Sequence, residues 1–281
     1  MKTPTYSIFL TIALLCTSCA FNVNFPDKIK GEGEVISEQI VLDAFSSLKL
    51  SRGWEVTLIP STSNYMVVEA NENLFEVLEF DNQSGKLDIG SKKQISSANA
   101  KSITLYFTER LETLKVSSGT VLKSEDRLNF ENLVLDISSG AEVYLDVDLK
   151  TLQLETSSGS EAVLSLNVED LFIDSSSGSS ALVETEAISI DVEASSGSEV
   201  TLRGTAHQLD VKTSSGAEVH SKGLESKSVV AKASSGSSIS VYPMEDLKAE
   251  VSSGGDVYYH HQPSGSIDMN KSKSGGSIKQ K

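Results

Sequence analysis

The stretch Leu-Glu-Thr-Ser-Ser-Gly-Ser-Glu-Ala-Val at residues 154–163 contains the tripeptide that organises most of this 281-residue chain. Ser-Ser-Gly occurs eight times, and successive copies are 21, 19, 19, 19, 19, 20 and 18 residues apart. A flexible linker would not keep such a period, so the repeat predicts one structural unit of about 19 residues that stacks on itself. The glycines that end the copies are Gly119, Gly140, Gly159, Gly178, Gly197, Gly216, Gly236 and Gly254.

Apolar and polar residues alternate on both sides of each repeat glycine. Before Gly159, Leu152 and Leu154 are apolar and Glu155 is charged, and after it Glu161 precedes Ala162. A period of two is typical of a strand with one buried face. Each unit is therefore predicted to be a strand, a Ser-Ser-Gly corner, a second strand and a polar turn of a few residues. We expect both serine columns to form hydroxyl ladders at the corner.

Identical columns at one period favour parallel, in-register coils over antiparallel hairpins. The predicted fold class is therefore all-β, a parallel β-helix (β-solenoid) with coils of about 19 residues. A β-propeller, which needs about 40 residues per blade, fits less well. Residues 101–281 are assigned to the regular repeats. Residues 31–100 are assigned to an irregular N-terminal β region, in which Ser51-Arg52-Gly53-Trp54-Glu55-Val56 looks like a diverged copy of the repeat, and residues 73–80 could be a helical turn or a strand.

The N-terminus has the pattern of an export signal. Lys2 is followed by the apolar run 8–15 and by Thr17-Ser18-Cys19, which resembles a bacterial lipoprotein signal. We therefore assign residues 1–18 to a signal peptide, Cys19 to lipid attachment and residues 19–30 to a tether. The alternative is a secreted protein without a lipid. Cys16 and Cys19 are the only cysteines, so the exported part has no disulfide and no zinc-binding thiolate.

The composition limits the classes of partner. The formal net charge of −15 argues against nucleic acid or an anionic membrane surface, because a polyanion would be repelled. Contact with a membrane is expected only through the N-terminal lipid. The sequence predicts no cofactor, and an outer-membrane lipoprotein is the expected form, with the side of the membrane left open.

Several further segments carry a resemblance to a known family. They include Phe45-Ser46-Ser47-Leu48, Gly53-Trp54-Glu55-Val56-Thr57-Leu58, Val67-Val68-Glu69-Ala70 and Gly85-Lys86-Leu87-Asp88-Ile89, followed by the repeated Ser-Ser-Gly-Ala/Ser-Glu-Val. In this order they resemble the head GIN domain family of bacterial auto-transporter adhesins, found in lipoproteins of Bacteroides-like bacteria. The resemblance implies a right-handed β-helix, a homo-oligomer and an adhesive role. It implies no catalytic residues.

One run of acidic residues is a candidate cation site. Four places before the glycine, successive coils carry Asp136, Glu155, Asp174 and Glu193, which would lie about 5 Å apart in an in-register stack. Divalent cations would relieve their repulsion. A solvated charged column is the simpler interpretation, so these residues are only weak metal candidates. A polysaccharide lyase or hydrolase that uses this acidic strand face is the alternative function.

An outward row of larger side chains is a candidate interface. Four places after the glycine, the coils carry Tyr144, Val163 and Leu182, and exposed apolar rows often mark contact surfaces. The repeated serines are expected to be structural, and no Gly-x-Ser-x-Gly motif supports a catalytic serine. The sequence therefore predicts a non-enzymatic, lipid-anchored β-solenoid of the cell envelope, an adhesin or binding module for a glycan or protein.

Overall fold

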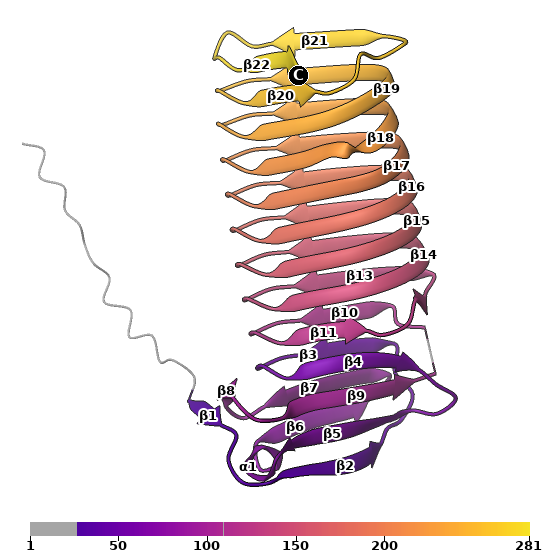
Figure 1. Ribbon diagram of the computed structural model, residues 1–281, viewed down its shortest axis with the longest axis vertical. Helices are drawn as coiled ribbons and strands as arrows, with labels where there is room; N and C mark the ends of the chain where they lie inside the picture. Colours follow the sequence, from indigo (N-terminus) through magenta and orange to yellow (C-terminus); the bar gives the residue numbers. More distant parts are fainter. Residues whose placement is uncertain (1–26, 109) are drawn as a thin grey trace, which may run out of the picture.

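The computed structural model describes residues 27–108 and 110–281, which form one long stack of β-coils (Figure 1). The predicted signal peptide and Cys19 lie outside the described residues. The N-terminal elements are β1 (Lys28–Lys30), β2 (Val35–Val41), β3 (Ser47–Leu50), β4 (Glu55–Pro60), β5 (Tyr65–Asn71), α1 (Glu72–Phe75), β6 (Leu78–Gln83), β7 (Lys86–Ser91), β8 (Gln94–Ser97) and β9 (Lys101–Phe107). The stack continues with β10 (Thr113–Val116), β11 (Val121–Ser124), β12 (Leu128–Asn129), β13 (Asn132–Ile137), β14 (Glu142–Thr156), β15 (Glu161–Ser175), β16 (Ser180–Ala194), β17 (Glu199–Thr213), β18 (Glu218–Ala233), β19 (Ser238–Val251), β20 (Asp256–Tyr259), β21 (Ile267–Lys271) and β22 (Ser277–Gln280).

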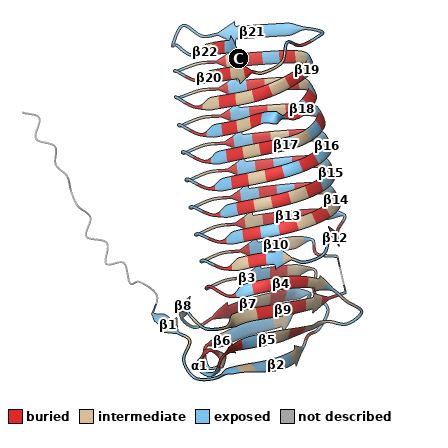
Figure 2. Cartoon of the chain, in the orientation of Figure 1, coloured by how far each residue is buried: buried red, intermediate tan, exposed pale blue. Residues whose placement is uncertain are grey.

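The predicted β-solenoid is confirmed by the strand pairing. Strands β14 to β19 pair in parallel, and residues in the same place of successive coils are partners, as Glu142 is with Glu161. Buried and exposed residues alternate along each strand (Figure 2). Stacking therefore converts each sequence column into a row of side chains that runs along the axis.

The expected polar turn at the second bend is wrong, because the chain bends there without leaving the strand. In β14, Leu149 and Leu152 are three residues apart and both point into the core, whereas Lys150 between them is exposed. Two successive outward residues, Lys150 and Thr151, shift the alternation and turn the strand onto the other side of the core. Each regular coil is thus one bent strand closed by a single turn.

The Ser-Ser-Gly corner is a tight two-residue turn. In the coil at 157–160, Ser158 has φ 54° and Gly159 has φ 69°, and the N–H of Ser160 donates to the C=O of Ser157 at 3.2 Å. Two consecutive positive φ values closed by this hydrogen bond define a type I′ turn. The N–H of Gly159 also donates to the C=O of Ser177 in the next coil at 3.2 Å, so each turn is bonded to its neighbour.

Contrary to the prediction, the hydroxyl network does not run through the repeated serines. It runs through the residue before Ser-Ser-Gly and the residue after it. Thr156 Oγ1 lies 2.9 Å from Ser175 Oγ and 3.0 Å from Ser179 Oγ, and all three residues are buried. These positions face the narrow edge of the core, where the two half-strands converge and large side chains do not fit. Small residues with mutually bonded hydroxyls satisfy both the space and the buried polar groups.

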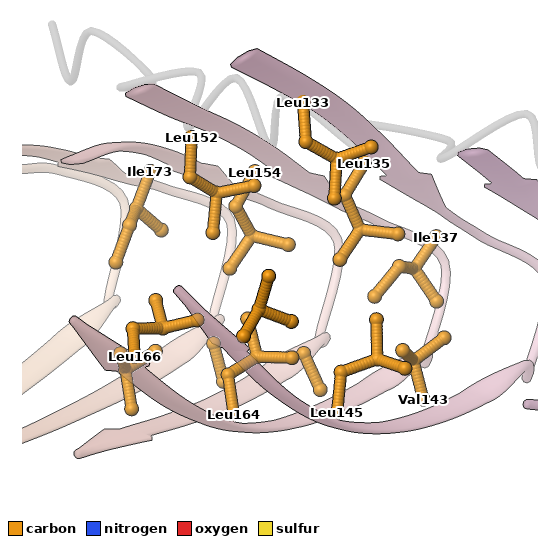
Figure 3. Close-up of a cluster of buried hydrophobic side chains, with 14 of the residues drawn as sticks. Leu133, Leu135, Ile137, Val143, Leu145, Leu152, Leu154, Leu164, Leu166 and Ile173 are labelled. Carbon is orange, nitrogen blue, oxygen red and sulfur yellow. The ribbon is translucent and has the colours of Figure 1, made fainter. Parts of the chain in front are cut away.

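The core lies between the two half-strands of each coil and runs the length of the stack. Figure 3 shows Leu152 and Leu154 on one side facing Leu164 and Leu166 on the other. Leu154 is fully buried, and burying a leucine side chain contributes roughly 1.5–3 kcal/mol. Because adjacent coils repeat these positions, the core is a continuous column of aliphatic side chains.

The N-terminal region is part of the same stack, although its order is not that of the chain. Leu48 of β3 pairs with Leu114 of β10 on one side and with Leu87 of β7 on the other. The coil of β3 and β4 therefore lies between the later coils of β7–β9 and β10–β11 (Figure 1). Parallel stacking thus already involves β3, β4 and β7 within the region assigned to irregular β structure. The diverged copy is confirmed, since Arg52 and Gly53 both have positive φ.

Antiparallel strands close the N-terminal end of the stack. β2 and β9 both pair antiparallel with β5, and β6 forms a hairpin with β7. Residues 73–80 contain both predicted options, because α1 ends at Phe75 and β6 begins at Leu78. Within the expected tether, Lys28–Lys30 form β1 and pair with β8, and residues 19–26 lie outside the described residues. No helix in residues 27–108 or 110–281 is long and apolar enough to cross a membrane.

Candidate binding faces

Each coil presents two exposed faces, one on either side of the Ser-Ser-Gly turn. We call the outward side chains four and six places before the glycine the pre-turn face. Those that follow the glycine form the post-turn face. The acidic run predicted from the sequence lies on the pre-turn face, and the row of Tyr144, Val163 and Leu182 lies on the post-turn face.

The structure brings the four acidic residues together in register. Asp136, Glu155, Asp174 and Glu193 are successive partners in the parallel ladder. Lysines occupy the same column at both ends of the run. Lys115 Nζ lies 3.2 Å from Asp136 Oδ2, and Lys212 Nζ lies 2.8 Å from Glu193 Oε1.

The interior of the acidic run is compensated by exposure and hydrogen bonding. Gln153 Nε2 donates to Glu155 Oε1 at 2.7 Å, and Glu155 is exposed to solvent. Within residues 27–108 and 110–281, no group of three or more histidine, cysteine, aspartate or glutamate side chains is arranged to hold a metal ion. The weak assignment of a cation site to this run therefore stays a prediction.

A second acidic group lies beside this run and was not singled out from the sequence. Asp191 and Asp210 are ladder partners two places before the charged column. Partial burial, together with the charges of Asp210 and Glu193, raises the pKa of Asp191, and Lys212 opposes that rise. The sequence signal was the repeated acid at this place in two consecutive coils.

A long groove follows the edge of the pre-turn face. It has a volume of about 590 Å³ and runs along the axis across six coils. One wall is the charged column, with Glu193, Lys212, Lys232 and Glu250, and the opposite rim carries turn serines such as Ser214. The wall is held by two ion pairs, Lys212 with Glu193 at 2.8 Å and Lys232 with Glu250 at 3.5 Å.

The predicted interface row forms a shallow depression on the post-turn face. Tyr144, Val163 and Leu182 are successive ladder partners and line a hollow of about 280 Å³. Tyr144 is 38% exposed, and its hydroxyl donates to Glu142 Oε2 at 3.0 Å, which raises the pKa of the phenol. The hydrogen bond restricts the orientation of the Tyr144 ring, which lies at one end of the row.

Charged residues beside this hollow were missed by sequence reasoning. Glu184 and Arg203 are ladder partners that line it, and Asp146 lies at its other end. Arg127 bridges Asp146 at 2.7 Å and Asp148 at 2.9 Å, and these contacts raise the pKa of Arg127. Arg127 belongs to the 21-residue interval between Gly119 and Gly140, so the two additional residues of that interval were its signal.

The pre-turn face also carries an apolar side chain that the sequence analysis did not select. Phe172 is 48% exposed and lies between Gln153 and Asp191 in the ladder. Its polar neighbours leave it isolated, so it forms no apolar row comparable to the one on the post-turn face. A single exposed apolar residue is ordinary on a protein surface.

The fold and these two faces define the class of the protein, a β-solenoid with broad, repetitive exposed surfaces of the kind that repeat proteins use for binding. The family model described as "Putative auto-transporter adhesin, head GIN domain" matches residues 44–185 and 166–263, and the chain belongs to this family. The resemblance inferred from the sequence is thereby confirmed. No curated protein matches the chain.

Solved structures from two Parabacteroides species have the same fold. A putative adhesin from Parabacteroides merdae is 19% identical with a TM-score of 0.68, and the match covers 90% of this chain and 99% of that one. A putative adhesin from Parabacteroides distasonis is 18% identical with a TM-score of 0.67, covering 90% and 100%. A protein from Parabacteroides distasonis described as a putative lipid binding protein is 16% identical with a TM-score of 0.64, covering 90% and 99%.

Proposed function

We propose that this protein is a non-enzymatic binding module of the cell envelope that holds a partner on its post-turn face. The observation that carries the proposal is the row of Tyr144, Val163 and Leu182, which is continuous over three coils and lines a hollow. The membership of a family described as adhesins supports a binding role. Nothing in the geometry of the acidic column favours the alternative of polysaccharide cleavage.

The chemistry of the row favours a protein partner over a glycan. Val163 and Leu182 are aliphatic, and aliphatic contacts with a polar rim are typical of protein interfaces. Glu184 and Arg203 beside the hollow supply both signs of charge, which would orient a partner rather than simply attract it. A second copy of the chain is one such partner, in accordance with the expected homo-oligomer.

Site-specific photo-crosslinking tests the position of the partner. A benzophenone amino acid at Val163 in the full-length protein, irradiated on intact cells, is expected to give a discrete crosslinked product. The same group at Phe172 on the pre-turn face is the matched control and is expected to give none. Equal products at both positions, or none at Val163, would refute the assignment of this face.

The oligomer and the glycan are separated by two further measurements. Light scattering of the residue 20–281 fragment is expected to give a multimer that Leu182→Glu dissociates and Phe172→Glu does not. Glycan binding by the same fragment that Leu182→Glu abolishes would replace the protein partner with a glycan on this face.

We also propose that Cys19 carries a lipid and holds the solenoid at the outer membrane. The support is the sequence Thr17-Ser18-Cys19 after the apolar run. Cells given an alkyne-labelled fatty acid are expected to label the wild-type protein and not Cys19→Ser. Labelling of Cys19→Ser at the wild-type level would contradict the anchor, and protease treatment of intact cells would report which side of the membrane the solenoid occupies.

A further inference from the structure

The groove on the pre-turn face has a repeating architecture that neither the acidic run nor the proposed partner face explains. Its lining comes from the same places in six consecutive coils, from Asp174 on β15 to Asn270 on β21. With strands about 4.8 Å apart, five intervals give a length of roughly 24 Å. A ligand that fills it must therefore be elongated, and it meets a similar set of groups in every coil.

The two sides of the groove offer hydrogen-bonding groups of different kinds. One wall carries two ammonium groups flanked by carboxylates, in one column of Asp174, Glu193, Lys212, Lys232 and Glu250. The opposite rim carries the half-buried hydroxyls of Ser195, Ser214 and Ser252. A hydroxyl both donates and accepts, a carboxylate accepts and an ammonium donates, so each coil can bond a ligand hydroxyl from two sides.

The floor of the groove is the strand backbone between the two columns. Ala194, Thr213, Ala233 and Val251 contribute this backbone, and their side chains are buried on the core side of the strands. Because none of these side chains rises from the floor, a flat ligand unit can lie there against the methylene stems of Lys212 and Lys232, while its polar edges point toward the two walls. A ligand with apolar faces and polar edges in every unit has the chemistry of a pyranose.

Four of the five charges of the wall cancel in pairs, and Asp174 at its end adds one carboxylate. Lys212 is paired with Glu193 and Lys232 with Glu250, and Lys248 Nζ adds a second contact to Glu250 at 3.4 Å. The hydrogen bond and the charge of Glu193 raise the pKa of Lys212, so the ammonium stays protonated. A charged ligand would have to break these pairs, and the net charge of −15 would repel a polyanion. A neutral ligand uses the free hydrogen-bonding positions of both partners.

We propose that this groove binds an extended, neutral oligosaccharide lying along the solenoid axis, with one sugar unit for each coil. The ion pairs hold the long side chains of the wall in place, which reduces the side-chain entropy lost on binding. The site is separate from the row of Tyr144, Val163 and Leu182 and does not depend on the function proposed for that face.

Titration calorimetry with linear hexasaccharides tests the inference. Cellohexaose, laminarihexaose and mannohexaose are the neutral probes, and hexagalacturonate is the acidic one. At least one neutral hexasaccharide is expected to bind the residue 20–281 fragment, with at least tenfold weaker binding of the corresponding trisaccharide and of hexagalacturonate. No binding of any neutral probe, or tighter binding of hexagalacturonate, would overturn the proposal.

Matched variants place the binding in the groove. Lys212→Met removes one wall donor, and Ser214→Phe fills the groove from the rim, so both are expected to weaken binding about tenfold or more. Lys115→Met and Ser138→Phe change the same repeat positions outside the groove and serve as controls, because Lys115 is likewise ion-paired, with Asp136. Equal losses in the controls would place the ligand elsewhere and refute the assignment.

The two proposals fail separately. Leu182→Glu on the post-turn face is expected to leave hexasaccharide binding unchanged, and Lys212→Met to leave crosslinking at Val163 unchanged. Thermal unfolding of each variant shows whether it is folded. If Ser214→Phe does not fold, the comparison of Lys212→Met with Lys115→Met still decides the question.

Discussion

Replacing a glycine by alanine can destabilise the fold in two ways, through strain in the left-handed backbone and through a clash with a neighbouring backbone. Two glycines with positive φ allow these two effects to be measured separately. Gly159 has φ 69°, and a Cβ added there would meet no heavy atom within 4 Å. Gly204 in β17 has φ 109°, and its added Cβ would lie 2.0 Å from the carbonyl oxygen of Thr185 in the neighbouring coil. We therefore predict that Gly→Ala is tolerated at the turn and severely destabilising in the strand.

The expected magnitudes follow from these contacts. At Gly159 only the left-handed backbone is penalised, which costs about 1 kcal/mol. At Gly204 roughly 1–3 kcal/mol of backbone strain adds to roughly 1–3 kcal/mol for displacing a packed strand, so a loss of about 2–6 kcal/mol is expected. For a fold of this size, 1 kcal/mol corresponds to about 2–4 °C in Tm.

Urea unfolding followed by circular dichroism measures both variants. Similar m-values for wild type and variants are required, because a repeat protein can lose cooperativity and unfold in parts. Ser158→Gly is the internal control. It relieves the strain at φ 54° but increases the freedom of the unfolded chain, so its stability is expected to change by about 1 kcal/mol or less. Equal losses for Gly159→Ala and Gly204→Ala would refute the role of close backbone approach.

Three other changes test the core, the hydroxyl network and the acidic pair. Leu154→Ala is expected to lower the free energy of urea unfolding by about 2–5 kcal/mol because Leu154 is fully buried. The control Phe172→Ala on the surface should lower it by about 0.5 kcal/mol or less. Comparable losses for the two variants would contradict the assignment of the core. Thr156→Val keeps the shape but removes the hydroxyl shared with Ser175 and Ser179, so a loss of about 1 kcal/mol is expected, and a gain in stability would show that the network is dispensable. Burial raises the pKa of Asp191, so the folded state binds the proton of this carboxyl more tightly than the unfolded state does. The contribution of Asp191 to stability is therefore largest below its pKa in the unfolded chain, and it falls as the pH rises through its pKa in the folded protein. Asp191→Asn should therefore raise the urea midpoint more at pH 7 than at pH 3, and the opposite pH trend would reverse the assigned sign.

The repeating part of the fold was predictable because stacking makes a sequence column a physical row. Alternation around Gly159 identified which residues point inward, and the period established that coils are parallel. The second bend was mistaken for a polar turn because Lys150 and Thr151 are polar in either case. A local sequence does not distinguish two outward residues in a bent strand from two residues in a loop.

The N-terminal region was less predictable because identical turn chemistry serves two different connections. Gln83-Ser84-Gly85 has the same pair of positive φ values, at Ser84 and Gly85, yet it joins β6 and β7 as an antiparallel hairpin. In the repeats the same turn joins half-strands that lie on opposite sides of the core. The difference lies in the next bend and in which coil is already available for pairing, and both are long-range properties.

The sequence predicted which residues form the exposed rows of the two faces. It did not predict the hydrogen bonds and ion pairs that balance the charges of these rows. The acidic run and the row of Tyr144, Val163 and Leu182 fell where the columns predicted. The hydrogen bond from Tyr144 to Glu142 joins neighbouring columns, and the bridge of Arg127 starts from an irregular interval. The volumes of the hollows depend on side-chain conformations, which periodicity does not report.

The in-register stack also explains why function should be sought in the departures from the repeat. A column of like charges accumulates repulsion between successive coils, so it can be extended only where opposite charges interrupt or end it. Here Lys115 ends the acidic run on one side, and Lys212 and Lys232 end it on the other. On the second side the lysines fall inside the groove of the pre-turn face, and there the same substitutions that relieve the repulsion place hydrogen-bond donors beside acceptors. Stability of the ladder and the capacity of the groove to bind a neutral polyol therefore arise from the same residues. This is why Lys212→Met and Lys115→Met, equivalent for the ladder, should differ in binding.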